Sequence, residues 1–362
     1  MSVEKNVPEI RFKGFSGGWE KDKLGQLYNF QYGEFNNNPS NGGQYPVYGA
    51  NGIIGGYTRF NAKSSAVIGH MGEYAGSVLW AEGEHFVTYN GTIAKPKKSD
   101  FNPLFGYFSL VKMDLKKICG GSGQPFLSYD SLERLDLVFP VESEQTAIGN
   151  TFQKLDNLIN QHQQKHDKLC SIKKSMLEKM FPKQGEIIPE IRFKGFSGEW
   201  ADATLSDVID VRSGKDYKHL GKGNIPVYGT GGYMLSVDSA LSNDEDAIGI
   251  GRKGTIDKPY LLRAPFWTVD TLFYAVPKPK FKLDYLYCLF QKIDWKKYDE
   301  STGVPSLSKI AINNIPVRVT NEEEQTTIGN YFQKLDALIN QHQQQIIKLN
   351  NIKQACLSKM FV

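Results

Sequence analysis

Two sequence segments occur twice in the chain of 362 residues, and this internal duplication constrains its fold more than any other feature. The ten residues PEIRFKGFSG run from Pro8 to Gly17 and again from Pro189 to Gly198. A second block, SEQTAIGNTFQKLDNLINQHQQ from Ser143, returns as EEQTTIGNYFQKLDALINQHQQ from Glu323. Two shorter matches, YPVYGANG from Tyr45 with IPVYGTGG from Ile225 and GSGQPFLS from Gly121 with STGVPSLS from Ser301, lie between these blocks, and elsewhere the two halves differ in almost every residue. Because self-similarity at a fixed period marks repeated structural units, we expect two copies of one unit, each a globular module followed by a long helix.

The tail of each copy has the apolar spacing of a coiled-coil helix. Apolar residues recur in steps of three or four from Ile148 to Met180, and again from Ile328 to Met360. Ser143 and Thr320 are the expected N-caps, because short hydroxyl side chains satisfy free backbone N–H groups there. Each helix is expected to run for about 37 residues, or about 55 Å at 1.5 Å per residue.

Chain connectivity then predicts how the two helices pair. The first helix joins the modules, and the apolar stripe of the second matches only the stripe of the first, so the chain must turn back and pair them antiparallel. We expect approximate two-fold symmetry and facing residue numbers that sum to about 504, which pairs Phe152 with Ile352 and Leu155 with Leu349.

The modules are predicted to mix helix and strand. Short stretches rich in Val, Ile, Tyr and Phe alternate with Gly, Asn and Ser clusters, as in curled sheets with frequent turns. One helix is expected over residues 105–114 and its counterpart over 284–294. The predicted class is α+β, with two mixed α/β modules at 1–142 and 183–320 separated by antiparallel coiled-coil helices at 143–182 and 321–362.

Composition limits the class of protein only loosely. The net charge of +4 is too small to indicate nucleic-acid binding by itself, so any such surface must come from local clustering. No apolar run approaches the roughly 20 residues that a membrane helix needs. The N-terminal text lacks the features of a secretory or transit signal, so a cytoplasmic protein without membrane contact is expected.

Polar residues of the helical block recur although they lie mostly off the apolar stripe, so packing between the helices does not explain them. One interpretation is that both copies present one surface to two copies of one partner. The alternative is a recent duplication, which extensive drift of the modules disfavours, although recombination confined to the shared segments stays open. The expected partner-docking residues are Gln145, Asn150, Gln153, Lys154, Gln325, Asn330, Gln333 and Lys334.

The combination of the IRFKGFSG segment, a turn ending in P-x-L-S and the EQ-x-x-IGN-x-FQKLD helix start resembles the specificity subunit of type I restriction-modification systems. The resemblance implies that each module is a target recognition domain for half of a bipartite, asymmetric double-stranded DNA site. It implies that the helices set the spacing and dock two modification subunits, which methylate adenine at N6 with S-adenosylmethionine. It leaves open whether two restriction subunits, driven by ATP with Mg, join the complex.

No catalytic role is expected for the chain, and no metal or cofactor is expected to bind to it. The stretch FNPLF at Phe101 is close to the NPPF-like motif of adenine methyltransferases, but the second copy has FKLDY there, and Pro103 suits the first turn of a helix. A glycine-rich phosphate loop is absent from the sequence. Two alternatives remain, namely a structural adaptor whose modules bind proteins, and an enzyme active on its own.

DNA contact is expected in loops where turn residues coincide with basic or hydrogen-bonding side chains. In the second module these are SGKDYKHLGKGN from Ser213 and IGRKG from Ile250, and in the first module GEFNNNPSNGGQ from Gly33 and IGHMG from Ile68. Arginine and lysine suit guanine, and asparagine suits adenine. The candidate residues are Asn36, Asn37, Asn38, His70, Ser122, Gln124, Lys215, Tyr217, Lys218, Lys222, Arg252, Lys253 and Thr302.

Overall fold

The computed structural model describes residues 6–35, 42–121 and 123–362, and it divides into two compact units. Unit 1 is Met1–Gln163 with Gln344–Val362, and unit 2 is Gln164–Gln343. The long helices α4 (Glu142–Lys179) and α8 (Glu322–Lys359) each contribute to both units. Each unit therefore contains one module, the first half of one long helix and the last half of the other.

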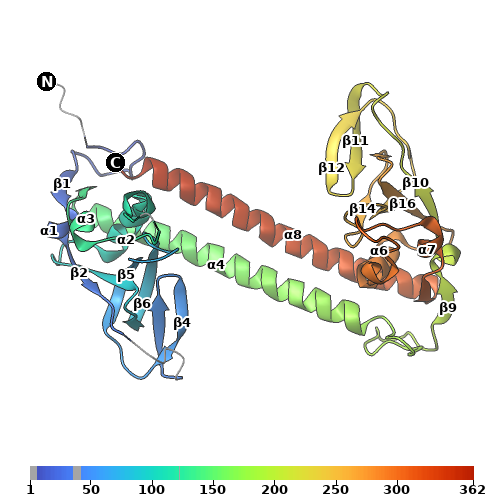
Figure 1. Ribbon diagram of the computed structural model, residues 1–362, viewed down its shortest axis with the longest axis horizontal. Coiled ribbons are helices and arrows are strands. Elements are labelled where there is room, and N and C mark those ends of the chain that lie inside the picture. The colour runs from blue at the N-terminus through green and yellow to red at the C-terminus, as the bar shows by residue number, and fades with distance from the viewer. Residues whose placement is uncertain (1–5, 36–41, 122) are drawn as a thin grey trace. The chain divides into compact units, whose positions relative to one another are not determined.

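Unit 1 is built on a curled sheet whose strands follow the order β2-β7-β5-β6-β3-β4, with β3 and β6 parallel and the other neighbours antiparallel. A separate antiparallel pair joins β1 to β8. Figure 1 shows α2 and the main sheet beside the beginning of α4 and the end of α8. The elements are β1 (Glu20–Lys23), α1 (Leu24–Leu27), β2 (Tyr28–Tyr32), β3 (Tyr45–Gly49), β4 (Gly52–Tyr57), β5 (Ala62–Gly69), β6 (Val78–Val87), β7 (Gly91–Pro96), α2 (Pro103–Lys112), the 3₁₀ helix η1 (Leu115–Ile118), α3 (Tyr129–Glu133) and β8 (Asp136–Phe139).

Unit 2 repeats this plan with its sheet broken into smaller pieces. Its strands form the orders β10-β16-β13-β14 and β12-β11-β15, and β9 pairs with β17. Figure 1 shows α6, α7 and β9 beside the first turns of α8. The elements are β9 (Ala201–Thr204), α5 (Leu205–Val208), β10 (Ile209–Ser213), β11 (Lys222–Gly229), β12 (Gly232–Val237), β13 (Ala247–Gly251), β14 (Tyr260–Leu262), β15 (Trp267–Thr268), β16 (Leu272–Pro277), α6 (Leu283–Lys292), the 3₁₀ helix η2 (Trp295–Tyr298), α7 (Lys309–Asn313) and β17 (Pro316–Val319).

The helices predicted within the modules are confirmed as α2 and α6. Asn102 caps α2, because its side chain accepts hydrogen bonds from the backbone N–H groups of Leu104 and Phe105, and Pro103 occupies the first turn. The resemblance of FNPLF to a methyltransferase motif is thus explained by a helix cap. The N-cap predictions for the long helices are wrong: Ser143 lies inside α4, and Asn321 rather than Thr320 accepts the Glu324 N–H at 2.9 Å.

Within each unit the long helices pair antiparallel. In unit 1 the Lys353 ammonium lies 2.5 Å from the Asp156 carboxylate, and in unit 2 Lys173 lies 2.6 Å from Asp336. The residue numbers of the two partners in each pair sum to 509, not to the predicted 504. One helix is therefore displaced along the other by five residues, or about 7.5 Å, from the predicted register. The predicted partner of Phe152 is therefore wrong. Ile352 is 40% exposed, and Phe152 shares its buried cluster with Leu357 and Phe361.

The repeated segment after Pro8 fastens the two long helices to each other in unit 1. Arg11 donates from Nε and Nη2 to the Glu144 carboxylate at 2.6 and 2.5 Å, near the start of α4. It also donates to the Gly17 carbonyl at 2.6 Å. The neighbouring Ile10 N–H donates to the Lys359 carbonyl at the end of α8, at 2.9 Å. We call Ile10, Arg11, Glu144 and Lys359 the helix clasp of unit 1.

Unit 2 repeats the clasp with the roles of the helices exchanged. Arg192 donates to the Glu324 carboxylate at 2.6 and 2.7 Å, near the start of α8, and Ile191 N–H donates to the Lys179 carbonyl at the end of α4. Both glutamates are buried, with side chains 0% and 1% exposed. The repeated segment that contains Arg11 or Arg192 therefore has an intramolecular role, which is to hold the antiparallel helices together in each unit.

In the described part of the chain, no helix combines the length and the apolar character that crossing a membrane requires.

Candidate nucleic-acid interface

Two of the segments predicted to contact DNA in the second module, the loop after β13 and the turn that includes Thr302, meet in unit 2. The loop after β13 lies against the turn after η2, since the Arg252 carbonyl accepts from Leu307 N–H at 2.9 Å and Gly254 N–H donates to Pro305 at 2.8 Å. Together they form a hollow of about 480 Å³. Its lining residues are Ser213, Arg252, Lys253, Phe273, Glu300, Ser306, Leu307, Ser308 and Lys309.

Arg252 is held at this hollow with its guanidinium exposed. The guanidinium carbon lies 5.7 Å from the centre of the Phe273 ring, a cation–π arrangement, and Nη1 donates to the Asp270 carbonyl at 3.4 Å. Stacking on a ring restrains the side chain and leaves other N–H groups of its fork directed to solvent. A restrained guanidinium fork suits bidentate donation to guanine.

The remaining candidates of unit 2 differ in their placement. Lys215, Lys218 and Lys222 are exposed, whereas Tyr217 is half-buried against the apolar cluster of the β12-β11-β15 sheet. Thr302 is exposed but does not line the hollow. Lys309 does line it and was missed, because the sequence places it at the start of a short helix rather than in a glycine-rich loop.

In unit 1 the loop that carries His70 and the turn that carries Gln124 meet through the same backbone contacts. Leu127 N–H donates to the His70 carbonyl at 2.8 Å and Gly72 N–H to Pro125 at 2.9 Å, and Met71 forms a β-bridge with Phe126. Gln124 is exposed on the same turn. Asn36, Asn37, Asn38 and Ser122, which are also candidates, lie outside the described residues.

His70 itself is not at the surface, so its expected direct contact with DNA is not supported. It is 4% exposed, and its ring lies against Tyr32 in a tilted arrangement with centroids 4.4 Å apart, while Tyr32 stacks on Tyr129 at 4.0 Å. Burial lowers the pKa of the imidazole, which favours its neutral form. His70 supports the loops of this surface rather than presenting a donor to a ligand.

Two expected partner-docking residues, Gln145 and Gln325, are buried and satisfied inside the protein. Gln145 accepts from Asn102 N–H and donates to the Pro140 carbonyl, both at 2.8 Å. Gln325 accepts from Lys282 N–H at 3.1 Å and donates to the Thr320 carbonyl at 2.7 Å. Each joins a long helix to the start of α2 or α6. Their recurrence reflects folding, and the docking interpretation is wrong for both.

The other docking candidates line an outward face of the two helices. Asn150 and Lys154 are exposed and recur as Asn330 and Lys334, and one turn further each helix exposes a leucine. Leu158 is 43% exposed and Leu338 is 44% exposed. Residues four apart share one helix face. We call this repeated surface the outer stripe: Asn150, Lys154 and Leu158 in unit 1, and Asn330, Lys334 and Leu338 in unit 2. Gln153, half-buried, and Gln333, exposed, lie beside it.

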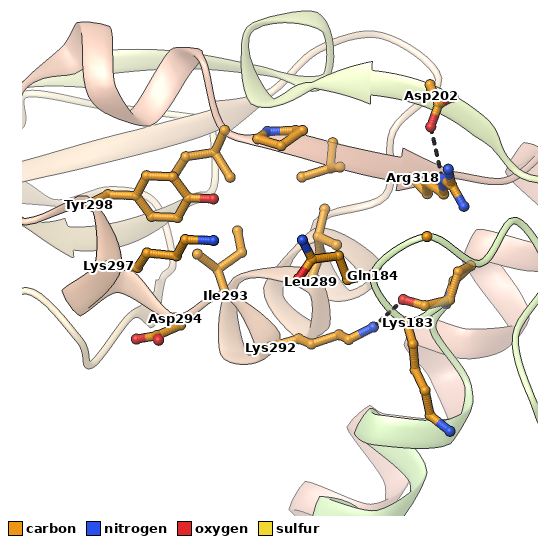
Figure 2. A pocket seen from close by; sticks show the side chains of 15 residues that line it. Lys183, Gln184, Asp202, Leu289, Lys292, Ile293, Asp294, Lys297, Tyr298 and Arg318 are labelled. Atoms are coloured by element: carbon orange, nitrogen blue, oxygen red, sulfur yellow. Dashed lines mark hydrogen bonds and ion pairs between the residues drawn. The ribbon is translucent and has the colours of Figure 1, made fainter.

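A second hollow of unit 2, of about 390 Å³, lies where the chain leaves α4, between that linker and the pair β9 and β17 (Figure 2). Lys292 donates to the Pro182 carbonyl at 2.5 Å, and Arg318 donates to Asp202 at 2.8 Å. Burial lowers the pKa of Lys292. None of the DNA-contact candidates lines this hollow. The Lys292 contact anchors the linker to the module, and the Arg318 contact joins β17 to β9.

The two modules are built on one plan, and in each of them equivalent backbone contacts bring a loop and a turn together. Residues 16–170 and again 197–351 match the family described as the type I restriction modification DNA specificity domain. The match covers most of the chain, which therefore belongs to this family and is a type I restriction-modification specificity subunit with two recognition domains. Specificity subunits are non-catalytic DNA-recognition proteins, so the expected lack of catalysis holds.

The chain is similar to two curated relatives of this kind. It is 27% identical over 128 residues to the type I restriction enzyme MjaVIII specificity subunit of Methanocaldococcus jannaschii, a stretch covering 34% of this chain and 30% of that one. It is 21% identical over 282 residues to the putative type I specificity subunit S.MpnORF507P of Mycoplasma pneumoniae, covering 73% and 74%.

Among solved structures, the S subunit of the type I restriction-modification system of M. genitalium has the same fold. It superimposes with a TM-score of 0.81 at 19% identity, over 98% of this chain and 99% of that one. The α+β class, with recognition modules and paired long helices, is thereby confirmed.

Proposed function

We propose that the chain selects a bipartite, asymmetric double-stranded DNA target, with the loops of unit 1 contacting one half and those of unit 2 the other. The assignment follows the predicted segments 1–142 and 183–320 for recognition, and 143–182 and 321–362 for spacing. The proposal rests on the two equivalent loop surfaces, one in each unit. The same backbone contacts assemble both, whereas the side chains they present differ, as expected of one frame adapted to two different half-sites.

The long helices are proposed to set the gap between the half-sites and to dock two adenine-N6 methyltransferase subunits through the outer stripe. S-adenosylmethionine would be bound by those subunits, and ATP with Mg by restriction subunits recruited through them, all in the cytoplasm. Support for docking comes from the exposed repetition of Asn150, Lys154 and Leu158 in the second copy. The same three residue types exposed on a long helix of each unit suit two copies of the same partner.

Selection of binders from a random duplex pool with the purified full-length chain tests this function. We expect enrichment of two different short sequences separated by a constant unread gap, and affinity that falls steeply with salt because phosphate contacts dominate the binding free energy. A pool that yields no enriched sequence, or binding that does not depend on salt, would show that the modules recognise something other than DNA.

Replacement of Arg252 by alanine is expected to relax selection at one base pair. Loss of a bidentate contact to guanine costs about 1–3 kcal/mol, or roughly 5- to 150-fold in Kd at that position. Affinity for selected duplexes with each base at that position measures the change. Lys215→Ala serves as the control, because loss of an exposed lysine that contacts phosphate weakens all sequences about equally. Unchanged selectivity in Arg252→Ala would exclude this residue from base contact.

A further inference from the structure

The loop surfaces of the two units can be compared position by position, because equivalent backbone hydrogen bonds position them. The Glu34 N–H donates to Val87 at 2.9 Å in unit 1, and Lys215 N–H donates to Thr268 at 2.8 Å in unit 2. Thr88 and Val269 likewise donate to the carbonyls of Tyr48 and Tyr228, both at 3.0 Å. The bridge between Met71 and Phe126 corresponds to that between Lys253 and Ser306.

These equivalences pair aromatic residues of unit 1 with charged or polar residues of unit 2. Phe35 takes the place of Asp216, Tyr89 that of Asp270, and Phe126 that of Ser306. In the basic loop, His70 and Met71 replace Arg252 and Lys253. Unit 1 therefore lacks the cations that unit 2 presents at the same positions.

The aromatic side chains of unit 1 are exposed and close to one another. Phe35 is 67% exposed, Tyr89 is 49% exposed and Phe126 is 41% exposed. The Phe35 and Tyr89 rings lie 5.6 Å apart, and the bridge between Glu34 and Thr88 holds their segments together. Exposed apolar side chains gathered in one patch mark an interaction surface rather than a folding requirement.

His70 connects Phe126 to the other two rings. Its ring lies 5.9 Å from that of Phe126, and its backbone N–H donates at 3.2 Å to the carbonyl of Asn90, the residue after Tyr89. The three aromatic side chains thus extend from loops that are joined through one buried histidine. We call Phe35, Tyr89 and Phe126 the aromatic patch.

Resting on the DNA-recognition function proposed above, we propose that unit 1 recognises its half-site through apolar contacts between the aromatic patch and thymine methyl groups in the major groove. The C5-methyl of thymine is the apolar group that a base pair offers there, and phenylalanine contacts it. Unit 2, with Arg252 and Lys253 at the equivalent positions, selects guanine through hydrogen bonds. The two modules thereby use opposite chemistries on one frame.

Uracil substitution tests this proposal, since it removes the methyl group and leaves every hydrogen-bonding group of the base unchanged. A duplex selected by the full-length chain is prepared with uracil for thymine in one half-site at a time. Binding by the Arg252→Ala variant identifies the half-site of unit 2. In the half-site of unit 1 we expect loss of each contacted methyl group to lower the affinity about fourfold. Uracil in the half-site of unit 2 should leave the affinity unchanged.

The Tyr89→Ala variant separates this chemistry from a merely structural effect. It is expected to bind uracil and thymine duplexes with more nearly equal affinity, since the ring that contacts the methyl is gone. Asp270→Ala, the equivalent change in unit 2, is expected to leave the thymine preference intact. Thermal unfolding of both variants verifies that these exposed substitutions leave the fold in place.

Several results would overturn the proposal without touching DNA recognition itself. These are a half-site for unit 1 that contains no thymine, equal affinity for uracil and thymine duplexes, or a Tyr89→Ala variant that retains the full preference. Increased fluorescence of 2-aminopurine at the contacted step without methyl dependence would indicate ring insertion instead. Failure of the pool to yield any bipartite sequence would instead refute the underlying function.

Discussion

Replacement of Arg11 by methionine is expected to lower the free energy of unfolding by about 3 kcal/mol, because removing one partner leaves a buried charge uncompensated. The Glu144 side chain is 0% exposed and receives two hydrogen bonds from the guanidinium. Without them its carboxylate is buried beside the first turn of α4. Denaturant unfolding at neutral pH measures the loss, and hydrogen exchange should show faster opening at the end of α8, where Ile10 binds Lys359.

Two controls make the test of the helix clasp specific. Lys21→Met removes a surface ion pair with Asp136, whose side chains are 54% and 44% exposed, and should change stability by less than about 1 kcal/mol. Arg11→Met combined with Glu144→Met should recover much of the loss, since a buried pair can be replaced by apolar residues. A loss in Arg11→Met no larger than in Lys21→Met would contradict the clasp.

Substitution of Leu158 and Leu338 together by glutamate is expected to abolish docking of the modification subunits. Each leucine lies in the outer stripe of one unit, and a carboxylate placed in the centre of an interface must be desolvated without a partner. We expect at least about 2 kcal/mol per site, or about thirtyfold in Kd. Native mass spectrometry with the modification subunit should show two bound copies for the parent chain, one for each single variant and none for the double variant.

Ile352→Glu provides the matched control for the outer stripe. Ile352 is also an exposed apolar residue of a long helix, at 40%, but its counterpart Ile172 is half-buried. Ile352 therefore belongs to no repeated surface, and two copies of the modification subunit should still bind to the Ile352→Glu variant. If Ile352→Glu reduced docking as strongly as the outer-stripe variants, helix charge rather than the repeated surface would govern assembly.

The sequence predicted two repeated modules and the antiparallel helices, because these follow from spacing and connectivity. It misplaced the helix register, because Phe152 packs on Leu357 and Phe361 at the chain end rather than on Ile352. Periodicity defines a stripe but not which of several apolar residues on it meet a given partner.

The same limit applies to polar side chains. Gln145 and Gln325 recur, but recurrence alone does not distinguish a docking residue from one that accepts a backbone N–H inside the protein. His70 follows a strand in a glycine-rich loop, as an exposed reader would. Its ring is covered by Tyr32, on which Tyr129, far along the chain, stacks in turn. Only the tertiary contacts reveal that arrangement.

In the proposed function, the paired helices set the distance between two unlike half-sites. Insertion of seven residues after both Gln163 and Gln343 lengthens each helix by about 10.5 Å while keeping the heptad pattern. Sequences selected from a random duplex pool by this variant measure the outcome. We expect unchanged half-sites with a gap longer by about three base pairs, at about 3.4 Å per base pair. An unchanged gap, or altered half-sites, would contradict the proposed function.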